Sequence, residues 1–157
     1  MVNSAKHVRV FRPADSAEVL GRQGQHLIPC VTTETCGAEG ISAGLVHMPP
    51  GKTSKAHYHA HSEIVVVCLR GTAATLIGPQ LTPHIHGPGE FIFIPDGVVH
   101  VAVNLSDTEE LVAAEMRTDP HFDDDVVLTP EFEAAVPDVV ARLRRDYSGT
   151  YQSSRSS

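Results

Sequence analysis

Histidines alternate along the stretch HYHAHSE, residues 57–63, which ends in a carboxylate. Residues two apart on a β-strand project from the same face, so His57 and His59 would lie side by side, within reach of one divalent ion. Glu63 follows after a gap that a short turn could close, and His100 lies in another alternating run, VVHVAVN. Three imidazoles and a carboxylate suit iron, manganese, nickel, copper or zinc. The spacing therefore predicts one divalent transition metal per chain, the alternative being a polar strand face without an ion.

A metal held in this way is a Lewis acid with positions left open for water, oxygen or substrate. Glu63 can also act as a carboxylate base next to an acidified substrate proton if it leaves the ion. His47, in the run ISAGLVHM, shares strand parity with Ile41, Ala43 and Leu45. It is a second candidate acid/base group if that face turns to the cavity, the alternative being a hydrogen-bonded core histidine.

Several other side chains are candidates for the cavity or for positions behind the ligands. His61 has the parity of a third ligand, but the turn before the carboxylate favours an exposed loop position. His84 and His86 form a second His-x-His between prolines and glycines, which favours an edge strand or loop; the alternative is that they line the mouth of the cavity. Phe91 and Phe93 alternate with two isoleucines, so one pair faces the barrel and the other a sheet-packing or dimer surface. The sequence leaves open which pair faces inward.

Composition limits the kind of protein that carries these residues. The chain has 157 residues, 41% hydrophobic and 20% charged, as is ordinary for one globular domain. Its formal net charge of −7 argues against a nucleic-acid or anionic-membrane partner. We see no basic run followed by an apolar stretch at the N-terminus, and no apolar run near the roughly 20 residues that span a bilayer. These features predict a cytoplasmic protein.

Short apolar runs recur between turn sequences from residue 27 onward. They include ISAGLVHM, EIVVVCL, FIFIP, VVHVAVN and ELVAAEM, and they are separated by sequences such as PPGK, GPGE and PDG. Glycine and proline fix the backbone at such turns. Seven or eight short strands at this spacing predict an all-β sandwich or barrel.

The one convincing helix is expected late in the chain. Thr129 and Pro130 read as an N-cap and first-turn proline, and apolar residues then recur at helical spacing. Pro137 must kink this helix or split it. The expected organisation is an N-terminal arm with a short strand, HVRVF (1–26), a β-barrel (27–120), a C-terminal helical segment (121–147) and a disordered tail (148–157).

The histidine stretch also lies within a longer pattern. Gly51 is followed after five residues by His57, then by His59, Glu63 and Gly71, and this resembles the first motif of the cupin superfamily. Seven residues separate Glu63 from Gly71, whereas the family's usual spacing is six. An extra residue is typical of a β-bulge in that strand, which affects the local register more than the ligands.

A second pattern follows in the expected order. Gly89, Pro95, Gly97, His100 and Asn104 match the second cupin motif at every position. The resemblance covers the middle of the chain, residues 51–104, and implies a jelly-roll barrel of two antiparallel sheets. It also implies that His57, His59, Glu63 and His100 point inward onto one metal, with Asn104 a candidate pocket residue.

What the resemblance implies about activity is a choice among classes. Small cupins include dioxygenases acting on enols, phenols and thiols, sugar isomerases, and metal-dependent cyclases of aromatic polyketide pathways. We expect an enzyme, an oxygenase acting on an enolic, phenolic or hydroxylated small molecule, with a zinc-type cyclase or isomerase as the alternative. A non-catalytic ligand-binding or sensing protein is the other class. Cupins of this size are usually homodimers, and the open face of a small sandwich needs covering.

Overall fold

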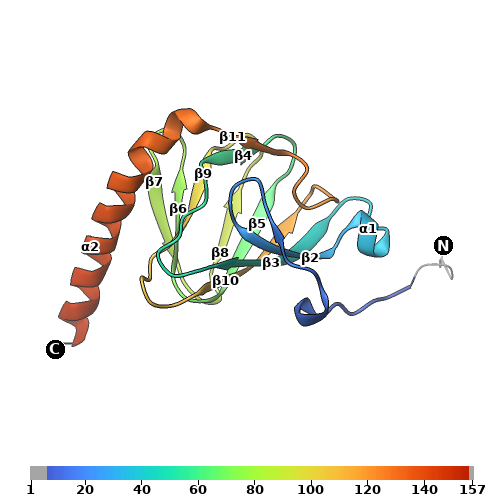
Figure 1. The fold of residues 1–157 in the computed structure, drawn as a ribbon, viewed down its shortest axis with the longest axis horizontal. Helices are drawn as coiled ribbons and strands as arrows, with labels where there is room; N and C mark the ends of the chain where they lie inside the picture. The colour runs from blue at the N-terminus through green and yellow to red at the C-terminus, as the bar shows by residue number, and fades with distance from the viewer. Residues whose placement is uncertain (1–6, 156–157) are drawn as a thin grey trace.

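The computed structural model describes the backbone of residues 7–155 and the side chains of residues 7–148. Its core is two antiparallel sheets that face each other (Figure 1). The six-stranded sheet has the order β1 (Val19–Leu20), β2 (His26–Val31), β3 (Ser42–Met48), β10 (Leu111–Arg117), β5 (Ile64–Arg70), β8 (Phe91–Ile94). The five-stranded sheet has the order β11 (Val126–Leu128), β4 (His57–His59), β9 (His100–Asn104), β6 (Ala73–Ile77), β7 (Thr82–His86). This confirms the predicted all-β, cupin-type jelly roll.

Strict alternation along the strands decides which side chains enter the space between the sheets. In β3 and β10 every second residue is buried, beginning with Ser42 and Leu111, while the residues between them are half-buried on the outer face. Gly71 allows the tight turn between β5 and β6, because its φ is +87° and a Cβ there would lie 3.0 Å from the carbonyl oxygen of Glu110. This turn carries the chain from the six-stranded sheet to the five-stranded sheet.

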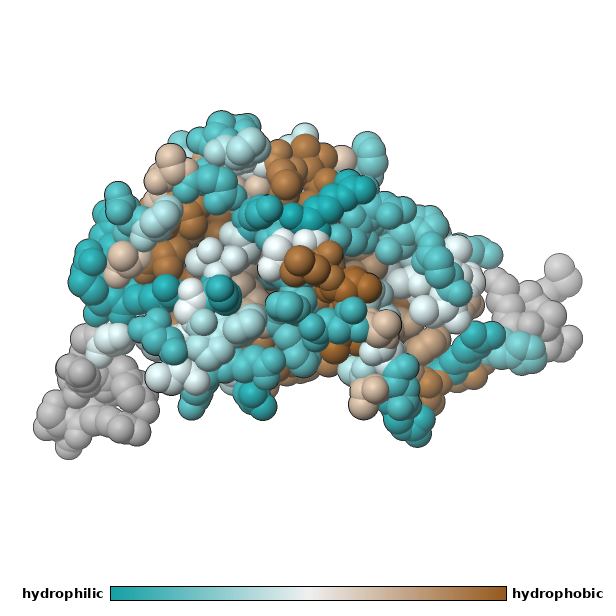
Figure 2. Space-filling view, in the orientation of Figure 1, coloured by the Kyte–Doolittle hydropathy of each residue, from teal (hydrophilic) through white to brown (hydrophobic). Residues whose placement is uncertain are grey.

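Helix α2 (Val136–Arg155) covers the outer face of the five-stranded sheet. Val136 and Val140 are buried in one hydrophobic cluster with Val101 and Val103 of β9, whose side chains point away from the other sheet. Figure 2 shows hydrophobic atoms between this helix, at the left of the view, and the sheet. No comparable element covers the outer face of the six-stranded sheet within the described chain, and Leu69, Phe91 and Phe93 are more than half exposed on that side.

Two of the expected boundaries differ from those in the structure. The barrel continues past residue 120, because β11 (Val126–Leu128) pairs with β4. Pro137 splits the helix as predicted, and the first piece is a 3-10 helix, η2 (Pro130–Ala135). The helix then continues to Arg155, where a disordered tail was expected, since no proline follows Pro137 to stop it. Residues 156–157 lie outside the described residues.

The remaining short elements are near the N-terminus. They are the 3-10 turn η1 (Pro13–Asp15) and helix α1 (Thr33–Cys36), which a capping box at Thr32 begins. The stretch HVRVF is extended but unpaired, so the short strand expected there is wrong for residues 7–11. Within the described chain, no helix is long and apolar enough to cross a membrane.

Candidate metal centre

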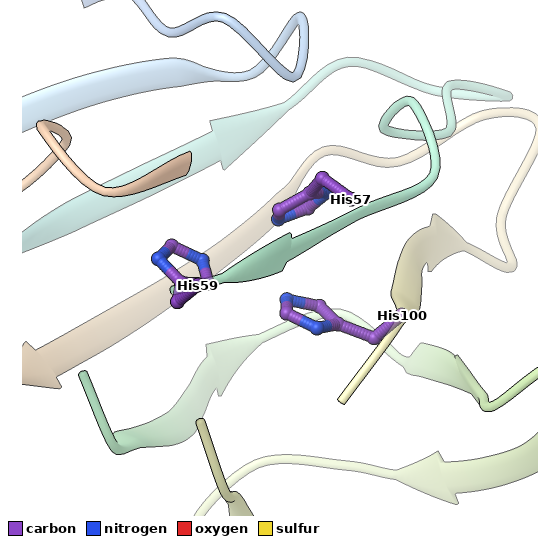
Figure 3. Close-up of side chains that lie close together, drawn as sticks. All are labelled: His57, His59 and His100. Carbon is purple, nitrogen blue, oxygen red and sulfur yellow. The ribbon is translucent and has the colours of Figure 1, made fainter. Parts of the chain in front are cut away.

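Three imidazoles converge between the two sheets (Figure 3). His57 and His59 come from β4 and His100 from β9, and the register places His57 directly opposite His100. The ring centroids lie 4.3 Å apart for His57 and His100, 5.3 Å for His57 and His59, and 5.5 Å for His59 and His100. One nitrogen of each ring lies within 4.8 Å of the others. The structure therefore brings together three of the four predicted ligands.

Hydrogen bonds at Nδ1 fix how each imidazole is presented. His57 Nδ1 lies 2.7 Å from the carbonyl oxygen of Lys55, and His100 Nδ1 lies 2.9 Å from that of Val98. A carbonyl oxygen only accepts, so both Nδ1 atoms carry the hydrogen, and in the neutral rings each Nε2 keeps a lone pair. His59 Nδ1 lies 3.0 Å from the Asp125 carboxylate, which has the same effect. Three Nε2 lone pairs facing one region suit a divalent transition ion.

Burial keeps these histidines neutral, as metal ligands must be. Burial is the largest cause in each case, and it lowers the pKa of His57 well below its usual value of 6.5 and that of His100 to about 4. Burial also lowers the pKa of His59, against the opposing effect of its hydrogen bond to Asp125. All three rings are less than 7% exposed. At neutral pH a cation would therefore not compete with protons for the ring nitrogens.

Asp125 fixes the loop that follows β4. Its Oδ1 accepts from His59, while its Oδ2 accepts from the backbone N–H groups of His61 and Ser62, at 3.1 and 2.9 Å, and from the Ser62 hydroxyl at 2.6 Å. Although burial opposes the shift, these hydrogen bonds lower the pKa of Asp125 to about 2. The His61 side chain is exposed, as its favoured interpretation predicted. Sequence reasoning missed Asp125, which lies in a run of three aspartates that carries no sign of this role.

Glu63, the predicted fourth ligand and base, does not lie with the three histidines in the structure. Its side chain is exposed, and its backbone N–H donates to the Thr118 hydroxyl at 2.9 Å. Ile64, only 2% exposed, lines the cavity instead. Six residues separate Ile64 from Gly71, so the position that the motif spacing selects holds an isoleucine. The extra residue in β5 does produce an irregularity, at Leu69, but that irregularity leaves Glu63 on the outer side.

A different carboxylate lies in the cavity. Glu115 is 7% exposed and projects from β10 of the opposite sheet, and it lines the same space as the three histidines. Arg117, two residues further on, donates to Glu115 Oε2 from Nε at 3.0 Å and from Nη2 at 2.5 Å. Both residues lie on the same inward face of β10 as Leu111 and Ala113. Two charged residues on the otherwise apolar face of LVAAEMR were the feature of the sequence that could have indicated them.

The remaining walls are mostly apolar, and their polar residues are Gln25, Thr75 and His86. Thr75 Oγ1 and His86 Nε2 lie 2.9 Å apart, and His86 Nδ1 is buried without a hydrogen-bond partner among the described residues. Burial lowers the pKa of His86. His86 thus lines the cavity, as its alternative interpretation held, whereas His84 is exposed on the edge strand β7. The apolar lining residues are Val46, Met48, Ile64, Val66, Ala73, Ile94, Ala102, Leu111 and Ala113.

Three other predicted site residues lie elsewhere. His47 is on the outer face of β3, away from the cavity, and its Nδ1 lies 3.1 Å from Glu110 Oε1. Phe91 and Phe93 are exposed on the outer face of β8, and Ile94 is the residue that points inward.

Asn104 is fully buried, but it lies outside the cavity lining. Its side-chain amide donates to the carbonyl oxygens of Met48, Pro49 and Glu109 at 2.8–3.2 Å, and its Oδ1 accepts from the backbone N–H of Ser106 at 3.0 Å. Its role is to hold the loop after β9 and not to contact a ligand.

Comparison with known proteins agrees with this geometry. Residues 44–115 match the family model described as the cupin domain. No curated protein sequence matches the chain. The polyketide cyclase RemF from Streptomyces resistomycificus superposes with a TM-score of 0.66 at 20% identity, covering 78% of this chain and 86% of that one.

Two other solved structures share the fold. A sugar phosphate isomerase from Silicibacter pomeroyi has a TM-score of 0.58 at 19% identity and covers 70% of this chain and 75% of its own. Lactobacillus farciminis oxalate decarboxylase has a TM-score of 0.62 at 20% identity, covering 76% of this chain but only 35% of its own. At these identities the likeness is one of fold. The motif match and the jelly-roll architecture together identify residues 44–115 as a cupin domain.

Proposed function

We propose that this protein is a metal-dependent enzyme acting on a small, mostly apolar molecule with an enolic or phenolic oxygen. The observation that carries the proposal is the convergence of three neutral, Nδ1-bonded imidazoles, His57, His59 and His100, on an enclosed and largely apolar cavity. A divalent transition ion held there supplies Lewis acidity and, if it is redox-active, electrons for oxygen chemistry. The protein's part is to fix the three rings and to keep bulk water from the ligand.

The charge in the cavity favours this substrate class over strongly anionic ones. Arg117 is the one lysine or arginine among the described residues that line the cavity, and it is fully enclosed. Its donors are already used by Glu115, by Asp123 at 3.3 Å and by the carbonyl oxygen of Phe122. Apart from the ion itself, a phosphate or dicarboxylate would find no lysine or arginine there that is not already paired. This argues against a sugar-phosphate isomerase and favours a neutral or singly ionised ligand.

The finer proposal is an oxygenase, and the second candidate is a zinc-type cyclase. Three protein ligands leave positions on an ion for a chelating substrate and for oxygen, which supports the first. The similarity of fold to a polyketide cyclase supports the second. Both require the same centre and differ in the ion that occupies it.

Metal content of the untagged protein, measured by mass spectrometry beside His59→Ala and His100→Ala variants, tests the proposal. About one equivalent of iron, manganese, nickel or copper, lost in both variants, supports the oxygenase and leads to oxygen-uptake assays with enols and catechols. Stoichiometric zinc supports the cyclase. Wild-type protein that takes up no metal after reconstitution contradicts both and leaves a non-catalytic binding protein.

We also propose that the protein is a homodimer. The support is the uncovered apolar face of the six-stranded sheet, with Phe91 71% and Phe93 56% exposed, and the unpaired N-terminal arm, in which Val8 is 99% and Val10 76% exposed. In a symmetric dimer each copy would cover the exposed sheet face and the arm of the other, because both copies carry the same two surfaces. Light scattering of wild type and Phe93→Glu tests this: a dimer that dissociates in the variant is expected, and a monomeric wild type at micromolar concentration contradicts it.

A further inference from the structure

The cavity that holds the three histidines also contains a carboxylate, which comes from the opposite sheet. Glu115 projects inward from the middle of β10, is 7% exposed, and lines the same cavity as His57, His59 and His100. The corresponding place on β5, where the chain enters the sheet, holds Ile64, and Glu63 points away from the cavity. Glu115 is thus the carboxylate that shares the interior with the imidazoles.

Hydrogen bonding leaves one oxygen of Glu115 available. Both bonds from Arg117 go to Oε2, and no described residue donates to Oε1. Arg117 is itself fixed, because it donates to the Phe122 carbonyl oxygen, pairs with Asp123 at 3.3 Å, and lies over the Phe122 ring at 4.3 Å. A planar guanidinium that is held in this way orients the carboxylate. Oε1 is then the oxygen free to face a ligand or ion.

The negative charge of Glu115 shares a buried space with three imidazoles. A carboxylate in such a place favours a divalent cation between the rings. Arg117 opposes this effect, but its charge is shared with Asp123 as well as with Glu115.

We propose that Glu115 is the carboxylate of the metal centre in this chain, and that it takes the ligand role that the first motif assigns to Glu63. The assignment rests on the proposed metal centre and deepens it. Glu115 contributes negative charge and a free oxygen toward the ion from the six-stranded sheet, while the three imidazoles hold it from the five-stranded sheet. The centre is then built from both sheets, with Arg117 as the residue that positions the carboxylate.

Cobalt(II) binding separates the two carboxylates. Wild type, Glu115→Gln and Glu63→Gln are titrated with Co(II), and affinity and the visible absorption bands of the bound ion are measured, which requires no substrate. We expect Glu115→Gln to weaken Co(II) binding 10- to 100-fold, the usual effect of losing a carboxylate that supports a metal ligand set, and to shift the bands. Glu63→Gln, the matched control, is expected to stay within twofold of wild type.

Two further variants guard against simple misfolding, since Glu115→Gln leaves Arg117 with a single acidic partner. Glu115→Asp keeps the charge and withdraws the oxygen by one methylene, so we expect an intermediate affinity. Glu115→Gln combined with Arg117→Gln removes both buried charges, and we expect it to melt cooperatively without metal and still to bind Co(II) more weakly than wild type.

The outcomes separate this assignment from the metal centre itself. Wild-type Co(II) affinity in Glu115→Gln, or a loss confined to Glu63→Gln, would overturn the assignment and leave the three-histidine centre standing. A wild-type protein that binds no Co(II), or whose Co(II) binding survives His59→Ala, would overturn the centre and the role of Glu115 with it.

Discussion

Two His-x-His sequences lie in strands of the same sheet, yet only one forms part of the candidate metal centre. His57 and His59 on β4 are each 2% exposed, and both rings face His100. On β7, His86 is buried against Thr75 while His84 is exposed. The spacing of the two histidines is the same in both strands, so the difference must come from their neighbours.

The position of each strand in the sheet supplies that difference. β4 lies between β11 and β9, so Asp125, just before β11, reaches one ring, and β9 carries a third imidazole to the pair. β7 is an edge strand with β6 as its one neighbour, and β6 offers only the Thr75 hydroxyl. The pair on β4 thus gains a third imidazole from β9 and an acceptor for His59 Nδ1 from the segment before β11, whereas β7 has neither.

The largest expected effect on metal affinity distinguishes the two His-x-His sequences when one histidine is removed from each. His59→Ala should lower metal affinity by at least about 100-fold, because a three-imidazole site becomes a two-imidazole site. His84→Ala should leave affinity unchanged, since that side chain is exposed on the edge strand. Metal content by mass spectrometry after equal exposure to Zn(II) checks both. Equal losses in the two variants would mean that the strand context does not matter.

Asp125→Asn should weaken metal binding by roughly 10- to 100-fold, as is usual when the group that orients a metal-ligating histidine is lost. An amide at this position no longer gives His59 Nδ1 a charged acceptor, and it loses acceptor capacity for His61 and Ser62. Asp124→Asn is the matched control, because Asp124 is the adjacent aspartate and is exposed. Competition with a chromophoric chelator measures both affinities, and equal values for the two variants would contradict the role of Asp125.

Acid should destabilise the metal-free protein in a defined window. Unfolded histidine has a pKa near 6.5, whereas burial holds that of His100 at about 4 and that of His57 well below 6.5. The unfolded chain therefore binds more protons between these values, and stability falls as pH decreases from about 6.5 to about 4. His100 alone corresponds to about 3 kcal/mol of unfolding free energy. Urea melts at several pH values test this. His100→Phe should flatten the profile, and His84→Phe should not.

The smallest expected effect concerns His86. His86→Phe should change metal affinity by less than about twofold, since this ring is outside the three-histidine group. It should lower the free energy of unfolding by about 1 kcal/mol, because the Thr75 hydroxyl loses its partner in a buried place. Adding Thr75→Val should restore most of that stability, since both polar partners are then gone. A loss of metal in His86→Phe would show that both pairs serve the centre.

Local periodicity predicted the strands and three of the ligands, because alternation decides which residues share a face. His57, His59 and His100 needed only that rule and the order of the two motifs. Glu63 failed because the sequence cannot show where the turn after β4 ends and β5 begins, and a shift of one residue moves a side chain to the opposite face. His47 was misplaced for a different reason. The residues that share its face were predicted correctly, but alternation does not show which face of the strand points inward.

Contacts between distant segments were beyond prediction. Asp125 lies 66 residues from His59, and nothing local marks it as the acceptor for that ring. Glu115 and Arg117 were closer to being predictable, since a charged pair on the buried parity of a strand requires an internal partner. The end of the barrel was misplaced because β11 has three residues and is held by its pairing with β4, so its own sequence gives little signal.

Strand β9 joins the metal centre to the C-terminal helix. His100 faces the cavity, while Val101 and Val103 face Val136 and Val140 of α2, and Arg144 donates to the Asn104 carbonyl oxygen at 2.8 Å. An ion present at 100 times its dissociation constant adds about 2.7 kcal/mol to the folded state. Because one strand serves both sides, amide hydrogen exchange should slow on β9 and α2 together when the ion binds. The C-terminal helix would then open less often in the metal-bound protein, so proteases should cleave the ion-free protein first.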